Sequence, residues 1–429
     1  MLVVERRSPE TFTLANGLQA IVLPSRRAPI VTQLVVYKVG SADETFGKTG
    51  IAHFLEHMMF KGTPSIGPTE FSRTVSRNGG RDNAFTDFDQ TGYYQTIAAD
   101  RLELVMRMEA DRMANLRIVE QELTPERQVV LEERRMRIDN VPSALLDEKA
   151  RAELFGERRP YGMPTAGFVE DVEKLSVDEL MEFYRRFYAP NNAVLIVAGD
   201  TTAEAVRKLA EQYYGPIPGR ATPARTRPAE GGPSLPQRAT RADARVAEPA
   251  WARDYLAPSY RAGETRHAYA LQVLSRLFGG SETSRLSRAL VTDGHLALSA
   301  GAGYSASSLG LSSFGIDVHP ARGASFAEIE QGVAYEMKKV LDGTIGAEEV
   351  ERAQNQLLAA AIYAQDSMGS GPRRYGAALC TGNSVADVDA WPQRIAAVRP
   401  EDVVAAARHV WRDTSAVTST LTPPEGKSP

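Results

Sequence analysis

Cysteine and histidine are scarce in this chain of 429 residues. Cys380 is the single cysteine, so no intrachain disulfide can form and no thiolate cluster can hold a metal ion. Any metal site must therefore use imidazole and carboxylate groups. The sequence has six histidines, at His53, His57, His267, His295, His319 and His409. Two of them fall within the segment 53–57, which singles out that segment.

A strong net charge and long apolar runs are also missing. The net charge of −4 gives no electrostatic footprint for DNA or RNA. No stretch approaches the roughly 20 apolar residues of a membrane-spanning helix, and the first residues, MLVVERR, lack the apolar run of a signal peptide. We therefore expect a soluble protein, either cytoplasmic or, if an export signal was removed, periplasmic; the sequence leaves both compartments open.

Large apolar residues are sparse between residues 215 and 245, where prolines alternate with glycine and arginine. This composition is typical of a linker. A role in nucleic-acid binding is disfavoured because the stretch lacks aromatic residues and acidic residues follow it. A chain of 429 residues exceeds one ordinary core. We therefore expect two domains, at 1–218 and 246–429, joined by a Pro/Arg-rich linker at 219–245.

The two expected domains resemble each other. A capping box at 176–179 opens a helix that leads to the apolar strand 193–197. Shifted by 223 residues, another helix opens at 400–402 and leads to the strand-like 416–417. The matched spacing favours duplication of one fold over a chance likeness of helix-to-strand units. The segment 276–280, equivalent to the histidine segment, has no ligand, so we expect one metal site.

The order of the predicted elements indicates the fold class. Strand-like stretches at 18–23, 31–39 and 93–98 interleave with helical ones without strict βαβ alternation. The sequence therefore predicts an α+β protein of two homologous domains, each a mixed, largely antiparallel sheet packed with helices. A phosphate-binding loop is missing, since the glycine pattern at 301–303 is too short to indicate a nucleotide site.

The segment 50–60 reads as an amphipathic helix. The apolar stripe at i, i+4, i+7 and i+8 should face the core, and it consists of Ile51, Leu55, Met58 and Met59. His53, Glu56 and His57 share the neighbouring face at i, i+3 and i+4. Two histidines one turn apart can both reach a zinc ion. Glu56 then points into the same site, which suits a general base.

A third ligand must come from elsewhere in the chain. Thr124 and Pro125 predict a helix start, and Glu126 and Glu133 lie two turns apart on one face of the helix that follows. Val129 and Val130 should give that helix an apolar side. Either glutamate could complete a His₂Glu set. Glu120, Glu122 and Glu132 are equally plausible on a solvated helix, so the residue pattern leaves the choice open.

Together these motifs resemble the pitrilysin-type inverzincins, whose HxxEH order is inverted relative to common zincins. The stretch 126–133 is similar to the family's E-R-x-x-V-x-x-E motif, about 75 residues downstream of the histidines. The resemblance implies one Zn²⁺ per chain, held by His53, His57 and Glu133. It also implies that Glu126 orients the ligands, with Glu132 the weaker candidate.

Two further segments resemble the same family. The segment 79–86 matches its substrate-edge strand, which implies that Asn83, Ala84, Phe85 and Thr86 bind substrate as an added strand. The loop 160–164, with Gly167, also matches. Chain length is similar to that of the processing-peptidase branch. Its members form dimers of two-domain subunits that close like a clamshell around a chamber, which admits short or unfolded peptides.

One departure from the family pattern implies a partner. Active members place an arginine and a tyrosine, seven residues apart, opposite the zinc to stabilise the tetrahedral intermediate. Here these positions read Gly294 and Gly301. Tyr304 is offset by three residues, which turns it to the opposite strand face. We therefore expect a heterodimer whose second subunit supplies the pair. Of the two acidic residues that mitochondrial relatives use for arginine selectivity, only Asp147 is kept, because the other position is Ser143.

Three functions compete for this sequence. The first is a zinc endopeptidase in which Glu56 deprotonates the attacking water and passes the proton to the leaving amine. The second is a non-catalytic assembly subunit of the same fold, which would not need all four metal-site residues. The third is a peptide-binding protein with residual metal affinity. The first is the prediction that the complete set of His53, Glu56, His57 and Glu133 favours.

Overall fold

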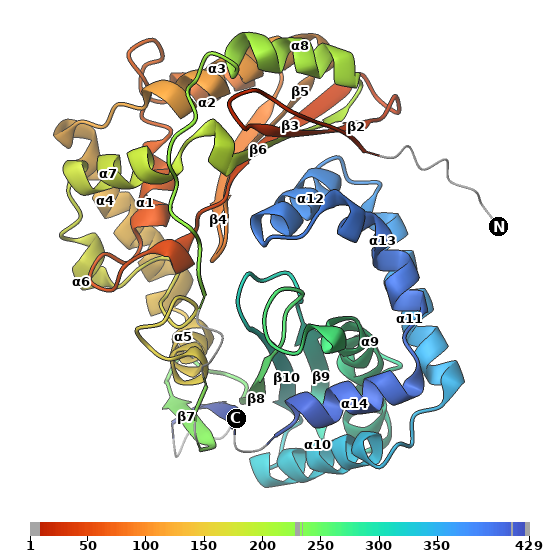
Figure 1. The fold of residues 1–429 in the computed structure, drawn as a ribbon. Helices are drawn as coiled ribbons and strands as arrows, with labels where there is room; N and C mark the ends of the chain where they lie inside the picture. Colours follow the sequence, from red (N-terminus) through yellow and green to blue (C-terminus); the bar gives the residue numbers. More distant parts are fainter. Residues whose placement is uncertain (1–8, 228–231, 234, 413–414, 425–429) are drawn as a thin grey trace. The chain divides into compact units, whose positions relative to one another are not determined.

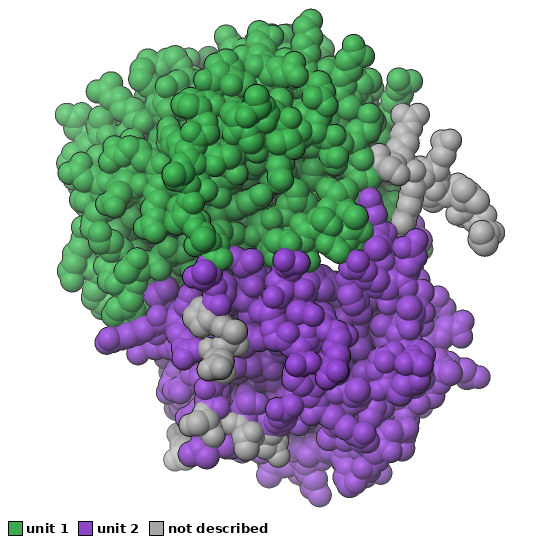
Figure 2. All heavy atoms as spheres, viewed as in Figure 1, with its two compact units in different colours: residues 1–133, 164–225, 363–388 green, residues 134–163, 226–362, 389–429 purple. Residues whose placement is uncertain are grey.

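The computed structural model describes residues 9–227, 232–233, 235–412 and 415–424. They form two compact units, each built from three separate segments (Figure 2). Unit 1 comprises residues 1–133, 164–225 and 363–388, and unit 2 comprises residues 134–163, 226–362 and 389–429. Among the described residues, no helix is both long and apolar enough to cross a membrane.

Unit 1 is a six-stranded sheet with helices on both faces (Figure 1). Its strands are β1 (Glu10–Thr13), β2 (Gln19–Pro24), β3 (Ile30–Tyr37), β4 (Arg81–Thr86), β5 (Thr91–Ala98) and β6 (Ala193–Gly199). Its helices are α1 (Ile51–Met58), α2 (Glu70–Arg77), α3 (Leu102–Asn115), α4 (Glu120–Arg134), α6 (Val169–Val172), α7 (Val177–Phe187), α8 (Ala203–Tyr213) and α12 (Ser370–Cys380). Short turns of helix lie at η1 (Ser41–Asp43), η2 (Ala99–Arg101) and η4 (Pro190–Asn192).

Unit 2 is a five-stranded sheet with its own helices. Its strands are β7 (Gln237–Ala242), β8 (Ala250–Ala257), β9 (Ala297–Tyr304), β10 (Ser312–Pro320) and β11 (Ala416–Thr422). Its longer helices are α5 (Pro142–Phe155), α9 (Ala268–Gly279), α10 (Phe326–Leu341), α11 (Ala347–Ala364) and α14 (Pro400–Val410), and α13 (Val385–Ala396) begins in unit 1. Shorter helical segments are η3 (Arg135–Asp139), η5 (Thr265–His267) and η6 (Ser287–Asp293).

The two sheets repeat one topology. Unit 1 has the strand order β1-β2-β6-β3-β5-β4, and unit 2 has the order β7-β11-β8-β10-β9. Strands β2 and β6 pair in parallel, as do β7 and β11, whereas every other neighbouring pair is antiparallel. Helix α7 and strand β6 each recur 223 residues later, as α14 and β11 (177 to 400, 193 to 416). The prediction of two homologous α+β domains with mixed, largely antiparallel sheets is confirmed.

Each half of the chain contributes one helix to the other half's sheet. Helix α5 comes from the first half, yet its Leu146 packs against Ala239 and Leu421 of unit 2. Helix α12 comes from the second half, yet its Tyr375 and Ala378 pack in the cluster that covers one face of the unit 1 sheet. The domain boundaries expected at 218 and 246 divide the chain between its two repeated halves. The compact units instead group residues by their contacts, so they exchange α5 and α12. Strand β7 lies within the stretch expected to be a linker.

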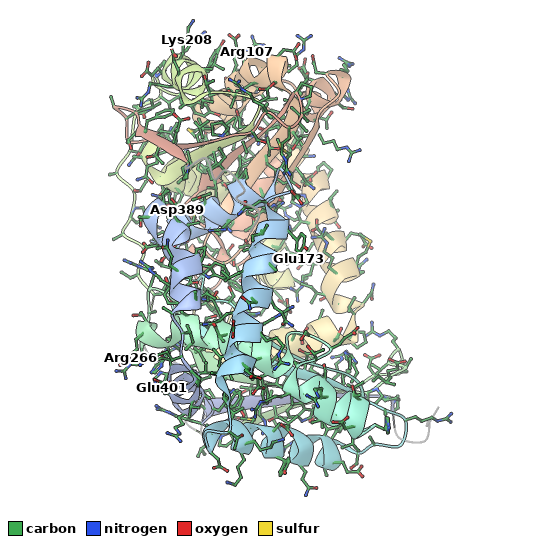
Figure 3. The ribbon with its side chains drawn as sticks, turned by 90° about the vertical axis from the view of Figure 1, so that its right-hand side faces the viewer. Arg107, Glu173, Lys208, Arg266, Asp389 and Glu401 are labelled. Carbon is green, nitrogen blue, oxygen red and sulfur yellow. The ribbon has the colours of Figure 1, made fainter. Side chains whose placement is uncertain are left out.

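The opposite face of the unit 1 sheet carries the larger apolar core, in which α1, α3, α4, α7 and α8 bury their apolar sides. Helices α3 and α8 pack side by side, and Figure 3 shows Arg107 of α3 and Lys208 of α8 at the same end of the unit. Some helices of this unit begin at capping residues of the usual kind. For example, α7 begins with the predicted capping box, because the Ser176 side chain accepts a hydrogen bond from the Glu179 amide.

Two details of the sequence prediction for α4 were wrong. The helix begins at Glu120, not at Thr124, so Pro125 lies inside it. Glu120 and Glu122 in the first turn suit the positive end of the helix dipole, and Leu123 is fully buried, which favours the earlier start. Val130 is buried as predicted, but Val129 is 49% exposed because it lies 100° away around the helix.

Candidate metal centre

Helix α1 presents three polar side chains beside a buried apolar stripe. Its residues Ile51, Leu55 and Met58 are at most 4% exposed, and so is Met59 directly after it, which confirms the predicted core side. The helix ends two residues before the predicted position, at Met58. Fixing one side of α1 in the core turns His53, Glu56 and His57 toward the neighbouring face, where α4 lies.

The start of α1 is held by groups that the sequence analysis did not single out. The Glu44 carboxylate is buried and accepts hydrogen bonds of 2.8 and 2.9 Å from the Gly50 and Ala52 amides. It thereby occupies the positive end of the helix. Gly50 has φ +82°, and a Cβ there would come within 2.8 Å of the Ala166 carbonyl oxygen and 2.9 Å of the Gly167 Cα. The loop that contains Gly167 therefore packs against the helix that carries the histidines.

His53, His57 and Glu133 come together between α1 and α4. Their ligand atoms all lie within 4.8 Å of one another. His53 Nε2 is 3.6 Å from Glu133 Oε1, and His57 Nε2 is 3.2 Å from Glu133 Oε2. The three side chains are 12 to 19% exposed, so the cluster is mostly buried but still reachable by solvent. Of the glutamates left open by the residue pattern, Glu133 is the one in this cluster.

These separations fit a zinc ion. Ligand atoms about 2.0–2.1 Å from a tetrahedral zinc lie about 3.3 Å from one another. The 3.2 Å from His57 Nε2 to Glu133 Oε2 is close to this value, and His53 Nε2 lies 3.6 Å from the other carboxylate oxygen. Two imidazoles and a carboxylate are also the donor set of many catalytic zinc sites, which keep a fourth position for water. The residues present therefore fit zinc.

Glu126 lies behind His57 and fixes its orientation. Its Oε1 accepts a 2.9 Å hydrogen bond from His57 Nδ1, because a carboxylate can only accept. With one proton held at Nδ1, it is the Nε2 atom of His57 that faces the site, and its lone pair becomes available to a metal ion when Nε2 loses its proton. Lys61, which the sequence analysis did not single out, forms an ion pair with the other oxygen of Glu126. His53 differs, since its Nδ1 is buried and has no hydrogen-bond partner among the described residues.

The charges of the cluster show what it would bind. Burial alone would lower the pKa of His57, but the hydrogen bonds that His57 donates to Glu126 and Glu133 outweigh burial and raise its pKa to about 9. Hydrogen bonds to His53 and His57 hold the pKa of Glu133 well below its usual range. The cluster therefore stabilises positive charge at its centre, as a cation site does.

Glu56 is held at the edge of the cluster by β4. The Thr86 hydroxyl donates a 2.5 Å hydrogen bond to Glu56 Oε2, which leaves Oε1 without that restraint. Burial raises the pKa of Glu56, against the effects of His53 and the Thr86 hydrogen bond, which lower it. Glu56 is not among the three grouped ligands, and its role as a base beside the metal stays a prediction.

Strand β4, predicted as the substrate-edge strand, is the last strand of its sheet and pairs only with β5 among the described strands. Its residues alternate between two faces. Ala84 and Thr86 face the side of α1, where Ala84 packs against the larger core. Phe85 faces the other side, where the Arg373 guanidinium lies 4.5 Å from its ring. The Asn83 side-chain oxygen accepts a hydrogen bond from the Ala84 amide.

Gly294, Gly301 and Tyr304, which the family comparison raised, lie in unit 2. Gly294 ends η6, and Gly301 lies in β9 opposite Asp317 of β10. A Cβ at Gly301 would be 2.8 Å from both carboxylate oxygens of Asp317, so a tyrosine there would require Asp317 to move. Tyr304 stacks on Phe314 and donates its hydroxyl hydrogen to the Pro258 carbonyl oxygen at 2.5 Å. Its hydroxyl is therefore engaged within unit 2.

Comparison with known proteins identifies the family. Residues 20–163 match the insulinase family, peptidase family M16, and residues 174–357 match the domain described as the peptidase M16 inactive domain. The zinc protease PqqE of Helicobacter pylori is 34% identical over 291 residues, which cover 67% of this chain and 65% of that protein. An uncharacterised zinc protease of Mycobacterium tuberculosis is 30% identical, with 94% of this chain and 91% of that protein aligned.

Solved structures agree with these relatives. A protease from Helicobacter pylori superposes with a TM-score of 0.89 at 27% identity, covering 97% of this chain and 99% of that one. An M16 inactive-domain protein from Pseudomonas fluorescens shares the fold, with a TM-score of 0.86 at 16% identity over 99% and 100% of the two chains. The chain belongs to the M16 family of zinc peptidases, which confirms the predicted resemblance to the pitrilysin-type inverzincins.

Proposed function

We propose that unit 1 binds one zinc ion through His53, His57 and Glu133 and hydrolyses peptide bonds with Glu56 as the general base. The observation that carries the proposal is the convergence of these ligand atoms at zinc-compatible spacing, beside a glutamate held by its own hydrogen bond. A non-catalytic assembly subunit is less well supported, because a scaffold needs neither the ligands nor the oriented Glu56.

The residues divide the chemistry among themselves. Zinc, when bound, would supply the Lewis acid that makes water nucleophilic near neutral pH. Glu126 keeps a proton on His57 Nδ1, so that Nε2 stays a ligand. Thr86 holds Glu56 Oε2, so Oε1 is the oxygen that accepts the proton of the attacking water and returns it to the leaving amine.

We infer that the substrate is an extended peptide that adds to the free edge of β4, alongside residues 83–86. Backbone groups of an edge strand pair with any extended peptide and so give affinity without a strict sequence requirement. Thr86 connects substrate binding with proton transfer, because its backbone belongs to the edge strand while its side chain orients Glu56. A closed chamber formed by a dimer would restrict the substrates to short or unfolded chains.

We further propose that activity requires a partner subunit. This chain lacks an arginine and a tyrosine at Gly294 and Gly301, and Tyr304 is engaged with Pro258. A homologous second chain in a heterodimer would supply the missing pair as donors to the developing oxyanion. A homodimer would bring no such pair from these positions. The expected result is weak hydrolysis by the purified chain and at least tenfold more after its partner is added; full activity without a partner overturns this proposal.

Two variants test the zinc chemistry. Glu56→Gln should retain one zinc per chain by atomic absorption but lose peptide hydrolysis by at least a hundredfold, since the amide cannot accept a proton. His57→Ala should lose the zinc itself. Glu132→Gln is the matched control, because Glu132 is exposed on the same helix as Glu133. Unchanged hydrolysis by Glu56→Gln, measured in the presence of the partner, rejects Glu56 as the base.

A further inference from the structure

Unit 2 has a pocket at the place that the duplication makes equivalent to the metal centre of unit 1. The residues 223 positions after His53 and Glu133 are Arg276 and Gln356. They contact each other in the same way, since Arg276 Nε donates a 2.8 Å hydrogen bond to Gln356 Oε1. Helices α9 and α11 thus take the places of α1 and α4. A histidine–carboxylate pair has become a guanidinium–amide pair, which supplies donors where the metal centre supplies lone pairs.

The pocket around this pair has a volume of about 440 Å³ and a positive lining. Its cations are Arg276, Arg285, Arg288, Lys339 and Arg352, and its acids are Asp293, Glu336 and Glu349. Five cations against three acids leave an excess of two positive charges. Such a volume is within the range of small-molecule sites.

Part of this lining is fixed and part is free. Glu349, which is 223 positions after Glu126, binds Arg285 with both oxygens, at 2.6 and 2.7 Å. The pair holds the Arg285 guanidinium in one orientation, much as Glu126 orients His57. Arg288 and Arg352 are exposed and form no ion pair or hydrogen bond through their side chains within the described part of the chain. These two guanidiniums are available to a ligand.

Two buried donors in the lining lack partners. Ser284 is 3% exposed, and its hydroxyl has no hydrogen-bond partner among the described residues. The same holds for Nη1 of Arg285, next to it in the chain. A buried polar group without a partner costs about 1–3 kcal/mol, so leaving two of them in one pocket indicates a ligand with acceptor oxygens.

We propose that this pocket binds a small anion that carries phosphate groups. Planar guanidiniums pair with phosphate oxygens through parallel hydrogen bonds, and the Ser284 hydroxyl adds a neutral donor. The excess of two positive charges matches a ligand with at least two negative charges. The site does not depend on the zinc chemistry of unit 1, because all of its lining residues belong to unit 2.

Inorganic pyrophosphate is the probe, titrated into the full-length chain by isothermal calorimetry. Saturable binding, tighter than that of orthophosphate, is expected. Arg288→Gln and Arg352→Gln should each weaken binding about tenfold, as expected for loss of a charged hydrogen bond. Both side chains are exposed, so neither variant should disturb folding. Arg266→Gln is the matched control; Arg266, labelled in Figure 3, is exposed and outside the lining.

Pyrophosphate also binds zinc, so His57→Ala serves as the background in which the metal centre cannot contribute. Binding that persists in His57→Ala and falls in Arg288→Gln supports the proposal. Binding that disappears in His57→Ala but survives both arginine variants places the anion at the metal centre and overturns it. Absence of saturable binding, or citrate binding as tightly as pyrophosphate, overturns it too.

Discussion

The Thr86 hydroxyl donates a 2.5 Å hydrogen bond to Glu56 Oε2 and so connects the edge strand β4 to the general base on α1. The two residues are 30 positions apart in the sequence, so the fold and not the local chain brings them into contact. The bond makes Thr86 a positioning residue, whose effect on hydrolysis should pass through Glu56.

Thr86→Val keeps the shape of the side chain and removes the hydroxyl. Loss of a hydrogen bond to a charged group is worth about 1.5–3 kcal/mol, so kcat should fall roughly 10- to 100-fold while zinc content stays at one per chain. Thr86→Ser, which keeps the hydroxyl, should restore most of the rate. A Thr86→Val enzyme with wild-type kcat and pH profile would show that Glu56 needs no such restraint.

Glu126→Ala should weaken zinc binding without removing a ligand. Residues that orient metal ligands typically change metal affinity 10- to 100-fold, and His57 loses its 2.9 Å partner in this variant. Competition with a chelator measures the effect. Glu122→Ala on the same helix is the control and should bind zinc like the wild type. Equal zinc affinity in both variants would contradict the role assigned to Glu126.

Gly50→Ala should destabilise unit 1. The backbone at Gly50 has φ +82°, and the added Cβ would press on Ala166 and Gly167. The left-handed conformation alone costs about 1–2 kcal/mol for an alanine, so urea unfolding should show at least that loss. Gly67→Ala is the control in the same unit, because φ is ordinary there and the nearest atom is 3.4 Å away. A loss no larger than that of the control would argue against the tight contact between the loop and α1.

The stability of unit 2 should depend on the ionisation of Asp254. Burial raises its pKa to about 6, against the attraction of Arg151, while Asp147 and Asp317 add repulsion. The unfolded value is near 3.9, so the folded state binds the proton more tightly. Stability from this group is therefore fully present below pH 4 and is lost as the pH rises through 6.

Asp254→Asn, which cannot ionise, measures that dependence. Relative to the wild type, its free energy of unfolding should gain about 2 kcal/mol between pH 4 and pH 7, as followed by urea titration at several pH values. Gln331→Ala, at an exposed site in the same unit that carries no ionisable group, should run parallel to the wild type across that range. A constant offset between Asp254→Asn and wild type would show that Asp254 ionises normally.

The sequence predicted what local pattern can encode. The spacing of His53, Glu56 and His57 placed them on one helix face, and the offset of 223 residues matched α7 and β6 to their counterparts in unit 2. Contacts between segments that are far apart in the sequence could not be predicted from these local patterns. The Glu44 carboxylate at the start of α1 and the Thr86 bond to Glu56 depend on how the sheet brings segments together. The choice of Glu133 came from family resemblance, and the structure supplied its geometry.

The exchange of α5 and α12 bears on how this chain is synthesised. One face of the unit 1 sheet, with Leu34, Val36 and Ile196, is covered by residues that follow position 363. The strands of that sheet have all been synthesised by residue 199. At about 5–20 residues per second, their apolar face stays uncovered for roughly ten seconds or more. A nascent chain of this protein therefore needs temporary shelter for that face, and a fragment that ends near residue 220 should aggregate.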